Sequence, residues 1–173
     1  MFVEKGTIDD ISELEMLYDQ LNDYLSANTN YPGWIKGIYP IRETAEKAID
    51  EGSLYILKKG YIIVGSIILN HEPEEAYKGA EWGIDVAYDK ILVIHTLVVH
   101  PKFMKQGIAR QLMDFTKELA VLSDIKSIRL DVSVNNTPAI KLYEQAKYKY
   151  ISTVDLGLPY EHLKWFKLYE LVL

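Results

Sequence analysis

The sequence predicts an α/β (α+β) fold in a single domain over residues 1–173, with a mixed central sheet of about six to seven strands flanked by about four helices. Apolar residues recur at helical spacing in some segments, and short β-branched or apolar runs occur in others. The two kinds of segment alternate after an opening hairpin, which is typical of helices packed on a sheet. A length of 173 residues suits one domain.

The predicted helices begin and end at recognisable signals. Thr7 with Asp10 resembles an N-cap pair before the first helix, and Gly52 follows the second. The third helix opens at Gly107, and the fourth begins near Asn136 or Thr137. The predicted helices are 8–25, 42–51, 107–122 and 138–147.

The predicted strands come from alternating or continuous apolar runs. Lys58-Lys59-Gly60 separates two such runs and predicts a hairpin. Residues 91–99 are nearly all apolar, as in a strand that is buried on both faces. The predicted strands are 2–4, 53–57, 61–69, 91–99, 127–134, 148–154 and 164–173. Residues 28–40 are predicted to form a loop, and the pattern places no element in residues 70–88.

Composition excludes several classes of protein. The chain has no cysteine, which excludes a disulfide framework, a thiolate metal site and a cysteine nucleophile. The formal net charge of −6 argues against a nucleic-acid partner, since phosphate binding normally needs a basic face. No apolar run is long enough to span a bilayer, and the first residues do not form a signal peptide. We expect a soluble cytoplasmic protein with no metal and no membrane partner.

A candidate anion site lies where the apolar strand 91–99 leads into the third helix. The first turn of a helix leaves N–H groups without partners, and its dipole adds partial positive charge. Gly107 removes a side chain at this point, while Lys105 and Arg110 add positive charge. An alternative is that Gly107 only relieves a tight turn. The glycine fingerprints of dinucleotide and ATP sites are absent, which argues against a nucleotide.

The same segment resembles the pyrophosphate-binding motif of the GNAT superfamily of acyl-CoA N-acyltransferases, written Gln/Arg-x-x-Gly-x-Gly/Ala. Gly107 and Ala109 match its last two defining places, and Met104 stands in the first place instead of Gln or Arg. The preceding strand resembles the family's Leu-x-Val-x-Pro ending, which is matched here by Leu97, Val99 and Pro101.

A second motif of the family follows at the expected distance. Its pattern Asn-x-x-Ala-x-x-Leu-Tyr is matched by Asn136, Ala139, Leu142 and Tyr143. Lys147 and Tyr148 replace the Gly-Phe that the family often carries next, so the turn after this helix is expected to differ locally. Together the two motifs identify the chain as resembling a GNAT acetyltransferase over about residues 94–148.

The resemblance implies acetyl-CoA as the cofactor. In this family two central strands splay apart after a bulge, and the pantetheine arm lies between them. The backbone of Leu97, Val98 and Val99 would bond the arm, the amides from Lys105 through Arg110 would hold the pyrophosphate, and Asn136 would reach the arm from the other side. The implied cofactor-binding residues are Leu97, Val98, Val99, Met104, Lys105, Gln106, Gly107, Ile108, Ala109, Arg110, Asn136 and Tyr143.

Two catalytic roles follow from the same resemblance. Tyr143 would give a proton to the leaving thiolate, the alternative being an aromatic packing residue. His95 would take the proton of the amine, because histidine titrates near neutral pH; the alternative is a buried histidine bonded to a carbonyl. A backbone N–H of Leu97 or Val98 would stabilise the oxyanion.

The acceptor is expected to be a primary amine of a small molecule or peptide. Tyr31, Trp34 and Trp82 are candidate acceptor-binding residues, since loop aromatics can form the wall of a small-molecule pocket. The activity expected is acetyl transfer from acetyl-CoA by direct attack in a ternary complex, in a monomer or homodimer. The alternatives are a non-catalytic acyl-CoA-binding sensor on the same fold, and nucleotide binding at the Gly107 helix.

Overall fold

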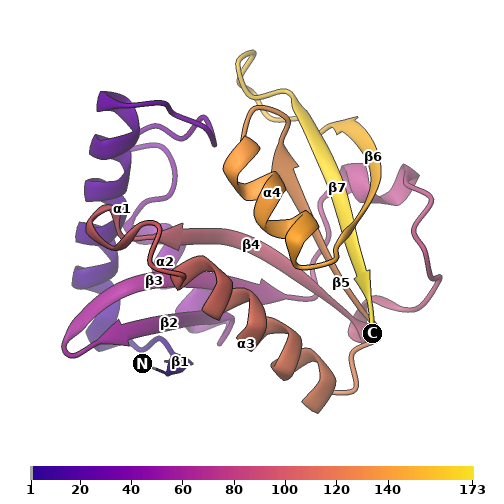
Figure 1. Ribbon diagram of the computed structural model, residues 1–173, viewed down its shortest axis with the longest axis horizontal. Helices are drawn as coiled ribbons and strands as arrows, with labels where there is room; N and C mark the ends of the chain where they lie inside the picture. The colour runs from indigo at the N-terminus through magenta and orange to yellow at the C-terminus, as the bar shows by residue number, and fades with distance from the viewer. Residues whose placement is uncertain (1) are drawn as a thin grey trace. The chain divides into compact units, whose positions relative to one another are not determined.

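The computed structural model describes residues 2–173 and contains a seven-stranded sheet (Figure 1). Its strands follow the hydrogen-bonded order β1-β2-β3-β4-β5-β7-β6. The pair β4–β5 is parallel, whereas β1–β2, β2–β3, β5–β7 and β6–β7 are antiparallel. The strands are β1 Val3–Lys5, β2 Leu54–Lys59, β3 Ile62–Asn70, β4 Ile91–Val99, β5 Ser127–Ser133, β6 Lys149–Asp155 and β7 Trp165–Val172. The predicted mixed sheet is therefore confirmed.

Residues 2–173 form four α-helices, as predicted. They are α1 Ile11–Ala27, α2 Arg42–Asp50, α3 Ile108–Leu122 and α4 Thr137–Gln145. The first predicted helix is shorter at its start, because Ile8–Asp10 forms a 3-10 turn. Thr7 and Asp10 make the predicted cap: Asp10 Oδ2 accepts from the Thr7 N–H at 2.8 Å and from its hydroxyl at 2.9 Å.

The chain divides into two compact parts. The first part comprises residues 2–30, Trp34–Leu69 and Thr96–Phe115, and the second comprises Tyr31–Gly33, Asn70–His95 and Thr116–Leu173. Strand β4 belongs to the second part up to His95 and to the first part from Thr96. The expectation of one functional domain over the whole chain stays a prediction.

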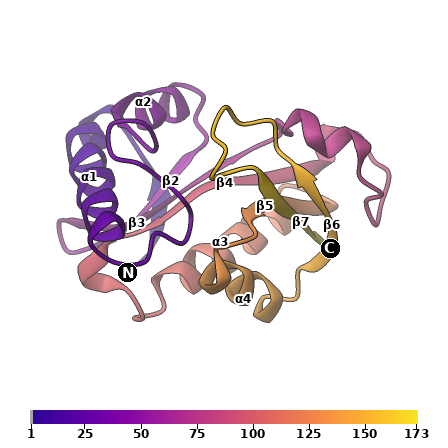
Figure 2. The ribbon, with the colours of Figure 1, turned by 90° about the horizontal axis from the view of Figure 1, so that it is seen from above.

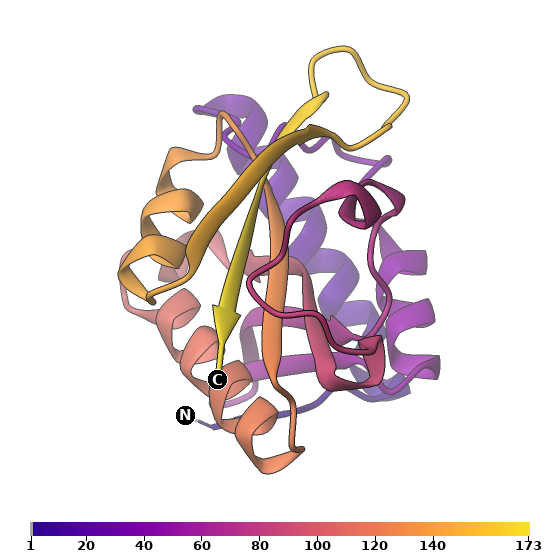
Figure 3. The same ribbon diagram turned by 90° about the vertical axis from the view of Figure 1, so that its right-hand side faces the viewer.

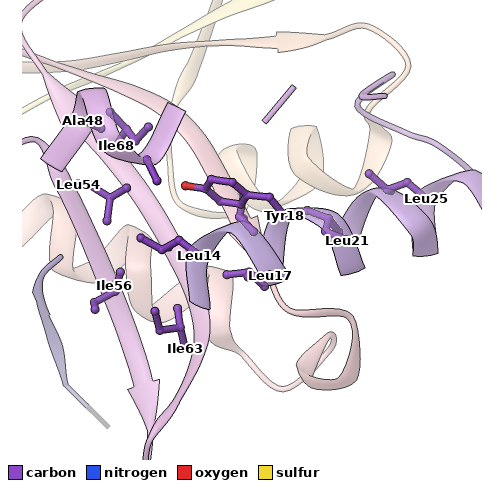
Figure 4. Packing of buried hydrophobic residues seen from close by; sticks show 12 residues of the cluster. Leu14, Leu17, Tyr18, Leu21, Leu25, Ala48, Leu54, Ile56, Ile63 and Ile68 are labelled. Carbon is purple, nitrogen blue, oxygen red and sulfur yellow. The ribbon is translucent and has the colours of Figure 1, made fainter. Parts of the chain in front are cut away.

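In the first part, α1 and α2 cover one face of β2 and β3 (Figure 2). Leu14, Leu17 and Tyr18 of α1 pack against Leu54 and Ile68 of the two strands (Figure 4). The start of α3 lies on the opposite face, where a side chain on Gly65 would meet Ile108 and Leu112. The helical spacing of the apolar residues thus gives α1 its buried side.

Gly65 is required by the close approach of α3 and β4. A Cβ added there would lie 2.8 Å from Ile108 Cγ2 and 3.0 Å from the carbonyl oxygen of Val98. Because the Val98 oxygen belongs to the backbone, Gly65→Ala is expected to lower the free energy of unfolding by about 1–3 kcal/mol, measured by urea unfolding. Gly79→Ala is the matched control, since nothing lies within 4 Å of that site. Equal urea midpoints for the two variants would contradict this packing argument.

The second part has layers on both faces of β5, β6 and β7 (Figure 3). Helix α4 covers one face, and the segment from Asn70 to Lys90 covers the other. This segment, which the sequence pattern did not place, contains two short 3-10 turns, Glu75–Gly79 and Tyr88–Lys90. Tyr77 lies within it and packs with Ile91, Val93 and Leu168 in a buried cluster.

Candidate active site

Strand β4 contains an irregularity immediately after His95. Thr96 has a φ of +44°, which is a rare conformation for a β-branched residue. The parallel pairing with β5 runs from Ile91↔Ser127 to Ile94↔Leu130, so it ends two residues before Thr96. Thr96 is buried, and its hydroxyl is hydrogen-bonded to the hydroxyl of Tyr39. Strained backbone of this kind is concentrated at functional sites.

Beyond Thr96, alternate residues of β4 direct their backbone groups to opposite edges of the strand. The N–H of His100 donates to the carbonyl of Val64 on β3 at 2.9 Å, and the Val98 carbonyl lies near Gly65 on the same strand. The N–H and C=O groups of Leu97 and Val99 therefore point away from β3. Pantetheine binding by the backbone of Leu97, Val98 and Val99 stays a prediction.

The N-terminus of α3 has the features of an anion site. Gly107 has a φ of +80° with open space where a side chain would lie, and Lys105 has a φ of +60°. Within residues 2–173, the N–H groups from Lys105 through Arg110 donate to no backbone carbonyl outside the helix. A helix N-terminus with free amides binds phosphate groups well, so this region fits a pyrophosphate.

Side chains around this N-terminus are partly engaged with one another. Arg110 forms an ion pair with Asp114, with Nε–Oδ distances of 3.0 and 3.2 Å. Gln106 Nε2 donates to the Lys102 carbonyl at 3.2 Å. Met104 packs against the apolar cluster of α1, α2, β2 and β3. The residue that replaces Gln or Arg in the motif thus makes an apolar contact with the fold.

Helix α4 carries the second motif. Asn136 is its N-cap, and Asn136 Oδ1 accepts from the Ala139 N–H at 3.4 Å, so this oxygen is engaged by the helix. At the other end, Lys147 has a φ of +70°. The turn therefore keeps the left-handed conformation that glycine adopts most readily, although lysine stands here in place of the glycine of the family motif.

Tyr143 on α4 is 6% exposed and packs with Tyr148 and Tyr169 at ring-centroid distances of 6.1 and 6.4 Å. Its hydroxyl has no hydrogen-bond partner among residues 2–173. Burial raises the pKa of Tyr143 well above its usual value, and the negative charge of Asp131 raises it further. The phenol is therefore held in its protonated form.

His95 makes two contacts with the segment Asn70–Lys90. Its Nε2 lies 3.0 Å from Asn70 Oδ1 and 3.2 Å from the carbonyl oxygen of Glu72. Asn70 Oδ1 also accepts from the Glu72 N–H at 3.0 Å, which fixes the orientation of this amide. Because both partners of Nε2 are acceptors, Nε2 carries a proton, and Nδ1 is the basic nitrogen of the neutral ring.

Asp131 on β5 is a titratable group that the sequence pattern did not reveal. Its Oδ2 accepts a hydrogen bond from the Tyr77 hydroxyl at 2.7 Å. Burial raises the pKa of Asp131 to about 6, the Tyr77 hydrogen bond offsets part of this rise, and the charge of Glu74 adds to it. The one available signal was an acidic residue in the middle of an apolar strand.

The sequence pattern also did not predict a buried ion pair between β5, the strand of Asp131, and β7. Arg129 and Glu170 are 3% and 2% exposed, with 3.0 Å between Nε and Oε1. Glu170 Oε2 accepts from the Gly83 N–H at 2.6 Å, and Arg129 Nη2 donates to the Ile84 carbonyl at 2.8 Å. The pair therefore anchors the segment that carries Tyr77.

The three residues predicted to bind the acceptor lie in different surroundings. Tyr31 is 39% exposed. Trp34 packs against the apolar cluster of the first part and makes an edge contact with Tyr39, with 5.6 Å between ring centroids. Trp82 stacks under the guanidinium of Arg129 at 4.3 Å and donates to the Tyr77 carbonyl at 2.9 Å. Acceptor binding by these residues stays a prediction.

The first part also encloses polar atoms that lack partners. The Tyr18 and Ser66 hydroxyls and Asn22 Oδ1 are buried without a hydrogen bond. Burial raises the pKa of Tyr18 to about 12, and the nearby Ser66 hydroxyl offsets part of that rise. Asn22 Nδ2 donates to the Tyr39 carbonyl at 3.2 Å.

Residues 2–173 contain neither a metal-binding cluster nor a membrane-spanning helix. No group of three or more His, Cys, Asp or Glu side chains there has the arrangement needed to hold a metal ion. No helix in this part of the chain is long and apolar enough to cross a membrane.

A family model described as the acetyltransferase (GNAT) family matches residues 14–148. Since the match spans well over half of the 173 residues, the chain belongs to the GNAT family of acetyltransferases. Members of this family take the acetyl group from acetyl-CoA, which is therefore the cofactor. The resemblance predicted from the two motifs is confirmed.

Solved structures of several acetyltransferases have the same fold as this chain. A GNAT acetyltransferase from Streptococcus agalactiae has a TM-score of 0.78 at 16% identity, covering 99% of this chain and 94% of its own. The ribosomal-protein-S18-alanine N-acetyltransferase of Escherichia coli has a TM-score of 0.69 at 13% identity, with coverages of 98% and 92%. The structure of yncA from Salmonella typhimurium with its cofactor acetyl-CoA has a TM-score of 0.70 at 10% identity, with the same coverages.

A curated relative matches a smaller region. The UPF0157 protein YqkA of Bacillus subtilis (strain 168) is 35% identical over 96 residues, which make up 53% of this chain. The matched region spans 27% of the length of that relative.

Proposed function

We propose that this chain transfers an acetyl group from acetyl-CoA to a primary amine of a small molecule or peptide, by direct attack in a ternary complex. The observation that carries this proposal is the Tyr143 hydroxyl, which is held protonated and has no hydrogen-bond partner among residues 2–173, on a side chain that is 6% exposed. Unlike the Tyr148 hydroxyl, the Tyr143 hydroxyl is not completely buried, so it can donate to a bound molecule.

The residues available to hold acetyl-CoA support this activity. The free amides at the start of α3, from Lys105 through Arg110, would bind the pyrophosphate. The edge of β4 presented by Leu97 and Val99 would bond the pantetheine amides, and one of these N–H groups would stabilise the oxyanion. Acetyl-CoA supplies an acetyl group activated as a thioester, with a thiol as the leaving group.

Tyr143 Oη holds the proton that the leaving sulfur requires. Phenols are weak acids at neutral pH, and burial makes Tyr143 weaker still. Its proton is therefore retained until a strong base appears beside it, which limits transfer to the moment when negative charge develops on sulfur.

His95 is the proposed base, with Nδ1 as the accepting atom. The contacts of Nε2 with Asn70 and the Glu72 carbonyl fix the ring and its tautomer. Both acceptors remain bonded when the ring becomes doubly protonated, so they also stabilise the imidazolium. Tyr31, Trp34 and Trp82 remain the proposed acceptor-binding residues. A monomeric or homodimeric state and a cytoplasmic location stay predictions.

Release of free thiol from acetyl-CoA in the presence of a panel of amines tests the proposal. We expect release above the blank with at least one primary amine. Binding of CoA without thiol release for any amine would instead favour a non-catalytic acyl-CoA sensor. A larger rise in melting temperature with ATP or NAD than with CoA would favour a nucleotide site.

His95→Ala is expected to lower kcat/KM by roughly 100-fold near pH 7, in line with the usual contribution of a general base. The loss should shrink as the pH approaches the pKa of the amine, because the amine then arrives neutral. The pH profile of thiol release measures this. If kcat/KM fell by the same factor at every pH, or did not fall at all, His95 would have a structural role in the strand and would not be the base.

A further inference from the structure

Asp131 has an environment that its neighbours in the strand do not share. It lies half-buried on β5, between Leu130 and Val132, and Tyr77 donates to its Oδ2 at 2.7 Å. Among residues 2–173 no Lys, Arg or His forms an ion pair with it, and no donor reaches its Oδ1. A carboxylate in this setting has one oxygen fixed and the other available.

The strand register directs the side chains of Asp131 and His95 to the same face of the sheet. The last parallel pair is Ile94↔Leu130, so His95 and Asp131 are the next positions along β4 and β5. Residues at equivalent positions of neighbouring strands project to the same face. The hydrogen-bond partners of both residues support this shared orientation. His95 contacts Asn70 and Glu72, and Asp131 contacts Tyr77. All three partners belong to the segment that covers this face of the sheet (Figure 3).

Tyr77 is itself held in place. Its side chain is fully buried and packs against Trp82 with 5.2 Å between ring centroids. The Trp82 ring lies against Arg129, and the pair Arg129–Glu170 binds the backbone of Gly83 and Ile84. Tyr77 therefore acts as a positioning residue that fixes the Asp131 carboxyl.

We propose that Asp131 binds the ammonium group of the acceptor and thereby selects a cationic primary amine, on the face of the sheet that also carries the histidine proposed to deprotonate it. This inference rests on the function proposed above. An ammonium group forms charge-assisted hydrogen bonds with a carboxylate, which a neutral acceptor of the same shape cannot match. The free Asp131 oxygen would accept from the ammonium, and Tyr77 would keep the other oxygen in place.

The charged and titratable groups around Asp131 determine the pH range in which it can bind a cation. Tyr77 and Glu74 of the covering segment and Tyr143 on α4 interact with Asp131, and His95 on β4 faces the same side of the sheet. Since the pKa of Asp131 is raised to about 6, the carboxyl is charged above that pH and neutral below it. Amine binding should therefore weaken as the pH falls through about 6.

Asp131→Asn tests the proposal in the CoA-bound protein, with phenethylamine and its neutral isostere 2-phenylethanol as probes for isothermal titration calorimetry. At pH 7.5 the wild-type protein should prefer phenethylamine. The variant should bind phenethylamine about tenfold more weakly or worse, as expected for loss of a hydrogen bond to a charged group, with 2-phenylethanol unchanged. Glu75→Gln removes the same charge from an exposed ion pair with Lys78 and should change neither affinity.

Folding of the variant can be checked independently. The folded-state pKa of Asp131 lies above its unfolded value of 3.8, so its charged form costs stability as the pH rises from about 4 to about 6. Asparagine carries no charge and can still accept from Tyr77. The melting temperature of Asp131→Asn at pH 7.5 should therefore equal or exceed that of the wild type.

Tyr77→Phe tests whether Tyr77 acts through Asp131, because a purely structural role would not change the pH dependence of amine binding. The Tyr77 hydrogen bond lowers the pKa of Asp131, so its loss should shift the midpoint of amine binding to higher pH. Equal phenethylamine binding by wild type and Asp131→Asn, or no wild-type preference for phenethylamine over 2-phenylethanol, overturns the proposal. Amine selectivity that depends on Asp131 without thiol release would overturn only the function proposed above.

Discussion

Arg129→Met is expected to lower the free energy of unfolding by about 3–5 kcal/mol, because it leaves the Glu170 carboxylate buried without a cation. Two donors to Glu170 remain, Ser127 Oγ at 2.7 Å and the Gly83 N–H at 2.6 Å. Neither supplies a positive charge. The variant also loses the hydrogen bond to the Ile84 carbonyl and the stacking on Trp82. Urea unfolding followed by circular dichroism measures the change.

The double variant Arg129→Met/Glu170→Leu separates the cost of an unpaired charge from the loss of packing. Replacing both partners of a buried ion pair with apolar residues is often nearly neutral. The double variant should therefore recover much of the stability lost in Arg129→Met. Lys36→Met breaks an exposed pair with Asp23 and should leave the urea midpoint unchanged. A double variant no more stable than Arg129→Met would show that packing of the guanidinium dominates.

Local patterns in the sequence predicted the elements that carry the family motifs. Apolar spacing located α1 and α3, and the Lys58-Lys59-Gly60 turn located the hairpin of β2 and β3. These features depend on residues close together in the chain, where periodicity and capping chemistry act. The family motifs then placed the α3 N-terminus and Tyr143 on the correct elements.

The features that sequence reasoning missed depend on contacts between distant residues. Arg129 and Glu170 are 41 positions apart, and Tyr77 and Asp131 are 54 positions apart. The segment 70–88 has no periodicity, because its aromatic residues do not line one side of a regular helix or strand. They are buried by contacts with distant parts of the chain. The φ of +44° at Thr96 opposes the local preference of threonine, so no local pattern could predict it.

Tyr143→Phe is expected to lower kcat by roughly 100-fold or more, because the variant lacks the proton proposed for the leaving sulfur. Phenylalanine keeps the ring that packs against Tyr148 and Tyr169, so acetyl-CoA affinity should remain nearly intact. Single-turnover thiol release measures the chemical step, and titration calorimetry with CoA measures binding. Because burial holds the pKa of Tyr143 well above its usual value, wild-type kcat should show no loss from tyrosine ionisation up to about pH 9.

Tyr148→Phe is the matched control, because it removes a hydroxyl from the neighbouring buried ring at 6.1 Å. The Tyr148 hydroxyl is buried and has no hydrogen-bond partner, so its removal should preserve turnover without lowering stability. A loss confined to Tyr143→Phe would assign the effect to one hydroxyl and not to aromatic packing around α4. Equal turnover in wild type and Tyr143→Phe, with the chemical step rate-limiting, would exclude Tyr143 as the acid and leave its unpartnered hydroxyl to be explained by cofactor binding alone.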